Sequence, residues 1–310
     1  MKILIIADNE INEWWDSSPG RQDERLEGVD LILSAGDLAP AYLEFLVTMT
    51  NVPLLYIRGN HDSIYDTYPP QGCIPVDDKI AEIYYDKETG SMRAVRVSRS
   101  RRAADIEKDV LMQLMPAWQG EIPGQLYGGS SLSGKGGVVW GSIPLRERFS
   151  GKIGIIRIVG LGGSMRYRKG RDMYTEAEMA KRVKQIERRL KYISAHGRLL
   201  DAAPRNLRGV ADISAGNNIA AVDAEAEAIP FSKRRPMDIL LTHAPCRRYG
   251  DMEDLPHRGF ECFNAMLDRW QPKYHFYGHV HKEYGRFERE LIHPSGTTLI
   301  NACECCFMEI

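Results

Sequence analysis

Long apolar runs are missing from this 310-residue sequence. No stretch reaches the roughly 20 apolar residues that a membrane-spanning helix needs. The first residues are strand-like and do not show the basic, apolar and cleavage regions of a secretory leader in series. We therefore expect a cytoplasmic protein with no membrane partner.

A net charge of one sign is also lacking. The chain has 41 Lys and Arg against 42 Asp and Glu, a formal net charge of -1. This balance gives no overall attraction to nucleic acid or to anionic lipid. The arginines between positions 93 and 102 form a basic stretch without interleaved aromatic residues, so we interpret it as a solvated face rather than a nucleic-acid patch.

Cysteine is scarce, with six residues in the whole chain. So few and scattered cysteines do not make a disulfide framework. Cys303, Cys305 and Cys306 crowd the last strand-like run. Neighbouring residues of a strand point to opposite faces, which separates Cys305 from Cys306. We interpret the group as reduced thiols rather than as a site for a soft metal.

The first 62 residues follow a β-α-β-α-β pattern. Lys2 to Ala7, Asp30 to Ser34 and Pro53 to Ile57 are short apolar runs, and Pro40 begins a helical pattern between the second and the third. The pattern predicts an α/β fold. In an open α/β sheet the carboxyl ends of the strands converge on one edge, where ligands bind.

The whole chain, 1–310, is expected to form one domain with insertions at about 85–150 and 195–235. The spacing predicts a long amphipathic helix from Thr175 to Ile193, with a Thr175-x-x-Glu178 capping pattern at its start. A second helix is expected around Phe260 to Trp270. Strands are expected in DILLTHAP, in KYHFYGHVH and in a closing pair that ends at Ile310.

Polar residues follow these apolar runs at five places. Each alone has an ordinary explanation, since Asp37 would cap a helix and the turn at Asn60 is common loop chemistry. Together, carboxylates and imidazoles that meet at one sheet edge repel or stay unsatisfied unless a cation joins them. The candidate metal-site residues are Asp8, Glu10, Asp37, Asn60, His243, His279 and His281, and His61 and Asp62 lie beside them.

The segment Gly278-His279-Val280-His281 favours two ions over one. In a loop tip both imidazoles can reach adjacent ions, which a carboxylate such as Asp37 can bridge. Two metals about 3.5–4 Å apart clamp the attacking and leaving oxygens of a phosphoryl displacement and generate hydroxide at neutral pH.

These motifs, in this order, resemble the calcineurin-like metallophosphoesterases. The motifs that carry the resemblance are Asp8, Gly36-Asp37, Gly59-Asn60-His61-Asp62, His243 and Gly278-His279-Val280-His281. The resemblance implies a four-layer α-β-β-α sandwich, in which two packed mixed sheets are flanked by helices and two metals lie at the sheets' edge. It further implies that Asp37 bridges the metals. Asp8 and His281 would belong to the first site, and Asn60, His243 and His279 to the second. His61 would contact the scissile phosphate, with Asp62 orienting it.

The sequence departs from this family at Glu10, which stands where the family's first motif, Asp-x-His, has a ligand histidine. A carboxylate can also bind Mn, Fe or Zn. We favour Glu10 as a ligand that selects Mn or Fe, with Zn as a further candidate. The alternative, in which Glu10 points away and the first metal binds weakly, stays open.

Two further residues are candidates for substrate contacts. Arg166 follows the Gly160-Leu161-Gly162-Gly163 turn and could pair with a phosphate oxygen. His257, in His257-Arg258-Gly259-Phe260 after the acidic DMEDLP segment, could likewise supply a substrate contact near His243. Ordinary loop roles remain open for both.

The sequence predicts a metal-dependent hydrolase that cleaves phosphoester bonds through metal-bound hydroxide. The expected enzyme is a phosphatase or phosphodiesterase acting on a phosphorylated small molecule or a nucleotide. A nuclease acting on nucleic acid is a less favoured alternative, as is a non-catalytic metal-binding assembly module. Nothing in the sequence specifies an oligomeric state.

Overall fold

Four parallel strands and one antiparallel strand form the first sheet of the computed structural model. The structure describes residues 1–15, 23–90, 92–98, 110–114, 138–140, 153–196, 236–285 and 287–310. The strand order in this sheet is β16 (Glu304–Glu309), β1 (Lys2–Ala7), β2 (Val29–Ser34), β3 (Leu54–Tyr56) and β4 (Ile74–Pro75). The strands β1 to β4 run parallel, so their carboxyl ends share one edge.

The second sheet has nine strands and is mixed. Four of them, β9, β12, β13 and β15, run parallel, and the strands on either side of this set are antiparallel to it. The order is β14 (Glu290–Ile292), β15 (Thr298–Asn301), β13 (Tyr274–Tyr277), β12 (Ile239–Thr242), β9 (Ile153–Leu161), β5 (Lys79–Asp86), β6 (Met92–Ser98), β7 (Val110–Leu114) and β8 (Val138–Trp140). A short ribbon joins β10 (Ser164–Met165) to β11 (Met173–Tyr174).

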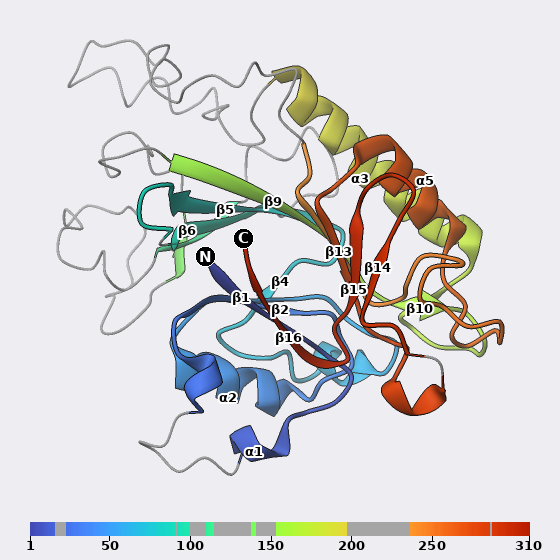
Figure 1. Cartoon of the computed structure of the whole chain (residues 1–310), viewed down its shortest axis with the longest axis horizontal. Coiled ribbons are helices and arrows are strands. Elements are labelled where there is room, and N and C mark those ends of the chain that lie inside the picture. Colours follow the sequence, from blue (N-terminus) through green and yellow to red (C-terminus); the bar gives the residue numbers. More distant parts are fainter. Residues whose placement is uncertain are drawn as a thin grey trace.

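Helices cover the outer face of each sheet (Figure 1). The helices α1 (Asn12–Trp15) and α2 (Pro40–Thr50) pack on the five-stranded sheet, while α3 (Glu176–His196) and α5 (Glu261–Trp270) pack on the nine-stranded one. A third apolar cluster fills the space between the two sheets. The four-layer α/β sandwich that the family resemblance implies is therefore confirmed.

The local signals in the sequence account for where these helices begin and end. Pro40 occupies the first turn of α2, where its missing N–H costs nothing, and Asn51 ends the helix in a left-handed conformation. At the start of α3 the Glu178 N–H donates to Thr175 Oγ1 and the Thr175 N–H donates to Glu178 Oε2. This reciprocal capping confirms the predicted helix start.

The two expected insertions differ in how far they can be described. The range 85–150 contains the end of β5 and all of β6, β7 and β8, which extend the nine-stranded sheet. Most of the range 195–235 lies outside the described residues.

Cys305 and Cys306 lie on β16 and point to opposite faces of the first sheet. Cys305 packs on the helix side and Cys306 on the side between the sheets, as strand geometry predicts. All six cysteines are free thiols. Within the described part of the chain, no helix has both the length and the apolar character needed to cross a bilayer.

Candidate metal centre

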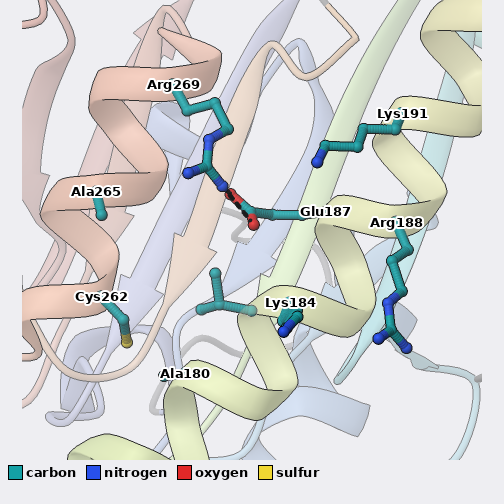
Figure 2. Close-up of a pocket in the computed structure, with 9 residues that line it drawn as sticks. Ala180, Lys184, Glu187, Arg188, Lys191, Cys262, Ala265 and Arg269 are labelled. Atoms are coloured by element: carbon teal, nitrogen blue, oxygen red, sulfur yellow. Dashed lines mark hydrogen bonds and ion pairs between the residues drawn. The ribbon is translucent and has the colours of Figure 1, made fainter.

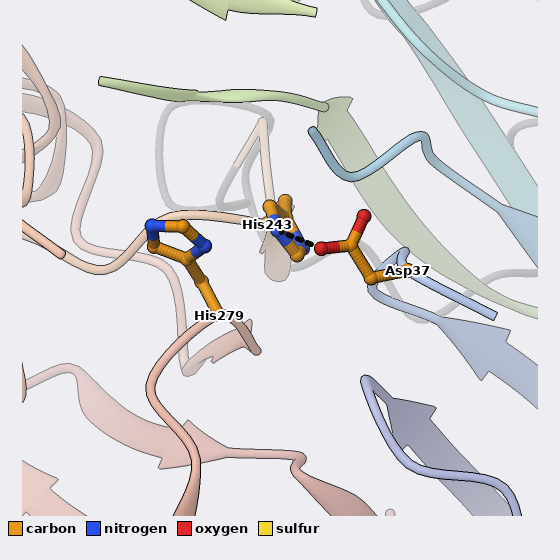
Figure 3. Close-up of side chains that lie close together, drawn as sticks. All are labelled: Asp37, His243 and His279. Carbon is orange, nitrogen blue, oxygen red and sulfur yellow. Dashed lines mark ion pairs between the residues drawn. The ribbon is translucent and has the colours of Figure 1, made fainter. Parts of the chain in front are cut away.

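Three of the predicted ligands converge where the carboxyl ends of strands from both sheets meet (Figure 3). Asp37 lies beyond β2 of the first sheet, His243 directly follows β12, and His279 lies two residues beyond β13. Their candidate ligand atoms all lie within 4.8 Å of one another. The cluster is thus held by strand ends from two different sheets.

The backbone is unusual at these strand ends. Asp8, Asp37 and His279 have φ values of 66°, 58° and 70°, in the left-handed region that residues other than glycine seldom occupy. Such conformations persist only where the surrounding structure over-determines them, and they gather at functional sites. The strain marks the same edge that the sequence motifs select.

Two glycines permit the close approach of the strand ends. A Cβ on Gly36 would lie 2.3 Å from the Gly59 backbone nitrogen, and a Cβ on Gly59 would lie 2.0 Å from Asp37 Oδ1. Any larger side chain would therefore separate the β2 and β3 tips or displace the Asp37 carboxylate. The glycines before Asp37 and Asn60 serve the geometry of the site.

His243 is fully buried and has a defined orientation. Its Nδ1 lies 2.8 Å from the Ala35 carbonyl, which can only accept, so Nδ1 carries the proton of that bond. Its Nε2 lies 3.1 Å from Asn60 Oδ1 and 3.2 Å from Asp37 Oδ2. In neutral His243, three electron-rich atoms therefore meet at this point, and a cation would satisfy all three.

Without a metal, a proton takes the place of that cation. Burial alone would lower the pKa of His243, but the charge of Asp37 and their hydrogen bond raise it to about 9. Burial alone would raise the pKa of Asp37, but His243 lowers it to about 2. The site therefore favours a positive charge between these side chains.

His279 presents the opposite ring nitrogen to the cluster. Its Nε2 lies 2.7 Å from the Pro256 carbonyl and donates to it, which leaves the Nδ1 lone pair free to bind a metal. Burial lowers the pKa of this imidazole to about 3, so the ring is neutral at physiological pH. The rings of His243 and His279 lie 4.8 Å apart.

Asp8 and His281 lie together beside the cluster. The Asp8 side chain is fully buried, its carboxylate accepts the His279 backbone N–H at 2.9 Å, and its Oδ1 lies 4.0 Å from His281 Nε2. Burial, with Asp37 nearby, raises the pKa of Asp8 to about 7. A buried carboxylate with so few donors fits a site for a cation. Together the imidazole, carboxylate and amide ligands suit a transition metal.

Glu10 lies outside the three-residue cluster. Its Oε2 accepts from Trp15 Nε1 at 2.8 Å, and its Oε1 accepts the Ala39 backbone N–H at 3.2 Å. These bonds tie Glu10 to α1 and to the start of α2. Each oxygen retains a second lone pair, so ligation by Glu10 stays a prediction.

His61 and Asp62 occupy different environments. His61 is exposed, and its backbone N–H donates to Asp37 Oδ1 at 2.8 Å. Asp62 is buried and accepts the backbone N–H groups of Asp37 and Gly59 at 2.9 and 2.7 Å. Asp62 therefore fixes the turns that carry the ligands. Its orienting of His61, which the family resemblance implies, stays a prediction.

The two expected substrate contacts are placed differently. The Arg166 guanidinium donates to the Met173 carbonyl and pairs with Glu178 Oε2 at 2.8 Å, so it is engaged in holding the β10–β11 ribbon. His257 lies at the cluster, with its ring 5.4 Å from the ring of His279 and its Nδ1 2.7 Å from Asp254 Oδ2. The structure brings only His257 to the site.

The glycine-rich turn before Arg166 supports the β3 tip. The Gly163 N–H donates to the Arg58 carbonyl at 2.7 Å. Asp77 joins the same two loops, since its carboxylate accepts the N–H groups of Arg58 and Gly162. Sequence reasoning missed Asp77, and its only signal was an acidic residue directly after a short apolar strand.

A separate groove of about 380 Å³ lies between α3 and α5 (Figure 2). Glu187 lies in it and is paired with Arg269 at 2.6 Å. The groove lies on the outer face of the nine-stranded sheet, and none of the predicted site residues lines it. It is therefore distinct from the candidate metal centre.

Comparisons with known proteins give short matches. No protein-family model matches the chain. Over 71 residues it is 38% identical to UPF0046 protein T07D4.2 of Caenorhabditis elegans, which covers 22% of this chain and 17% of that protein. UPF0046 protein K07C11.7 of the same organism is 34% identical over 68 residues, or 22% of each chain. The matches span about a fifth of these curated relatives.

Two solved structures align along most of the chain at low similarity. TT1561 of Thermus thermophilus has a TM-score of 0.38 and 10% identity, and the alignment covers 98% of this chain and 89% of that one. A second structure has a TM-score of 0.43 and 11% identity over 99% of this chain and 94% of the other. Similarity at this level carries no argument about activity.

Proposed function

We propose that the protein is a metal-dependent hydrolase of phosphoester bonds, a phosphatase or phosphodiesterase of the calcineurin-like kind that its motifs resemble. The observation that carries the proposal is the convergence of Asp37, His243 and His279 within 4.8 Å, from strand ends of both sheets. The ordered motifs of the sequence add the reaction class.

The proposed centre holds two transition-metal ions, with Mn or Fe favoured and Zn as a further candidate. Asp37 would help to hold both ions. Asp8, His281 and Glu10 would complete one site, and Asn60, His243 and His279 would complete the other. When bound, the ions would neutralise phosphoryl oxygens and make a water molecule more acidic at neutral pH.

The chain's own residues prepare this chemistry. The carbonyls of Ala35 and Pro256 hold the two imidazoles with one lone pair each directed at the cluster. Asp62 keeps the β2 and β3 tips together. His61 is exposed, with its backbone anchored on Asp37, and is assigned to donate a proton from its ring to the leaving oxygen.

A hydrolysis assay of the Mn-loaded protein tests the proposal. The panel contains phosphomonoesters, phosphodiesters and a single-stranded oligonucleotide, and Asp37→Asn is the matched inactive variant. We expect turnover of a small ester that disappears in Asp37→Asn. Bound metal without turnover of any substrate would contradict the proposal and favour the non-catalytic module. Turnover of the oligonucleotide alone would favour the nuclease.

A further inference from the structure

A buried chain of hydrogen bonds lies beneath the two imidazole ligands. His275, in β13, is fully buried and is flanked by Thr242 and Cys246, which are also fully buried. Its Nε2 lies 2.7 Å from Thr242 Oγ1, and its Nδ1 lies 3.4 Å from Cys246 Sγ. None of these residues belongs to the proposed ligand set.

The direction of every bond in this chain can be assigned. The Thr242 hydroxyl lies 2.6 Å from the Ala244 carbonyl, which only accepts, so the single hydroxyl proton is used there. His275 Nε2 must therefore donate to Thr242, and Nδ1 is left to accept the Cys246 thiol proton. Burial lowers the pKa of His275 to about 3, which agrees with one neutral tautomer.

These hydrogen bonds connect β12 and β13, the two strands whose ends carry the imidazole ligands. Leu240 of β12 pairs with His275 of β13 in the parallel ladder. His243 directly follows β12, between the two residues that His275 contacts, and its carbonyl accepts the Gly278 N–H at 3.0 Å. His279 is the next residue after Gly278. Any movement of residues 242–246 relative to β13 would therefore change the distance between the two ligands.

We propose that His275 is a positioning residue for the metal centre. It holds residues 242–246, and with them His243, at a fixed place beside the β13 tip that carries His279. The inference rests on the metal centre of the proposed function, but it does not depend on the reaction catalysed there.

Calorimetric titration of metal-free protein with Mn²⁺ tests the inference. In His275→Leu and Thr242→Val we expect the affinity to fall about tenfold, the lower end of the usual effect of residues that orient metal ligands. His275→Gln keeps an amide donor for Thr242 and should lie between His275→Leu and the wild type. Leu190→Ala, in the buried face of α3, is a control for general destabilisation and should bind Mn²⁺ with the affinity of the wild type.

Unchanged affinity in both His275→Leu and Thr242→Val would overturn the proposal. If His275→Leu does not fold, Thr242→Val decides the question, because valine matches threonine in shape. Nitrogen-15 NMR of the His275 ring gives an independent reading. We expect Nε2 to carry the proton and Nδ1 to carry none from about pH 5 to 8, a range that spans the ordinary pKa of histidine. A ring protonated on Nδ1 would contradict the assigned chain of bonds.

Failure of this inference differs from failure of the proposed function. Mn²⁺ binding that depends on His275, without hydrolysis of any phosphoester, would remove the function and leave the positioning role. Hydrolysis together with a metal affinity that does not depend on His275 would leave the function and remove the positioning role. Absence of Mn²⁺ binding in the wild type would remove both.

Discussion

His243 Nε2 lies 3.2 Å from Asp37 Oδ2, and these two residues come from different sheets. The pair spans the junction of the two sheets and sets the position at which a cation would bind. The pH dependence of stability, the effect of substituting Gly59 and the rate of hydrolysis can each be measured.

The metal-free protein should lose stability as the pH rises from about 7 to about 9, since His243 has an ordinary pKa of 6.5 and a folded-state pKa of about 9. Because the pKa of His243 is raised on folding, its contribution to the free energy of unfolding is complete below the unfolded-state pKa. That contribution is lost as the pH rises through the folded-state pKa. Asp37, with a pKa of about 2, stays charged throughout this range. Thermal unfolding at several pH values provides the measurement.

The same titration in Asp37→Asn supplies the control, because the asparagine no longer raises the pKa of His243. The fall in melting temperature between pH 7 and 9 should be smaller in this variant. Bound Mn²⁺ should also remove it in the wild type, since the ion replaces the proton. An equal fall in all three samples would contradict this account of the pair.

Gly59→Ala should weaken metal binding and lower the free energy of unfolding by about 1–3 kcal/mol, as overpacking in a tight site does. The new Cβ would lie 2.0 Å from Asp37 Oδ1. Gly170→Ala is the matched control, because its nearest contact is the flexible Met173 side chain at 2.8 Å. Chemical denaturation and Mn²⁺ titration of both variants make the comparison, and equal losses would argue against a special role for Gly59.

His61→Ala should lower phosphoester hydrolysis by about 10²–10⁴-fold, the usual contribution of a general acid, and leave the metal content unchanged. Ser63→Ala, an exposed position in the same 3-10 turn (Asp62–Asp66), should keep full activity. Rates and elemental analysis are measured on the same preparations. A fully active His61→Ala enzyme would contradict the assignment of His61 as the proton donor.

Glu10→Ala should reduce the metal content from about two ions per chain toward one if Glu10 completes the first site, since an ion held by fewer ligands is lost more readily. Glu13→Ala removes a carboxylate from α1 nearby and serves as the control. Two ions in both variants would show that Glu10 only anchors Trp15 and the start of α2.

Much of this architecture could be predicted because its signals are local. The Lys2–Ala7 strand and the long helix starting after Thr175 follow from apolar periodicity and capping residues. The approach of His243 to His279 follows from a general rule, because neighbouring parallel strands of one sheet end at a common edge. Asp37 joins them from the other sheet, which only the family resemblance implied.

Other features could not be predicted because they depend on contacts between distant segments. Arg166 sits beside a glycine turn suited to phosphate, yet Glu178 and the Met173 carbonyl take its guanidinium. Asp62 follows His61 in the chain, but its carboxylate turns back to the Asp37 and Gly59 amides. Sequence spacing places such residues near a site without fixing which partner they choose.

The buried hydrogen bonds of His275 were missed for the same reason. His275 lies in an apolar strand and Cys246 stands alone in the sequence, so neither carries a motif. The only signal was a histidine inside a strand that otherwise reads as core, where a polar group needs a partner. The partner itself is set by the parallel register of β12 and β13.

Metal stoichiometry tests the central claim most directly. Protein purified without chelators is loaded with Mn²⁺, desalted and subjected to elemental analysis, for the wild type and for Asp37→Asn. The account predicts about two ions per chain in the wild type and a clear loss in the variant, whose shared carboxylate is gone. A wild-type protein that retains no metal after loading, or an Asp37→Asn variant that retains as much as the wild type, would contradict it.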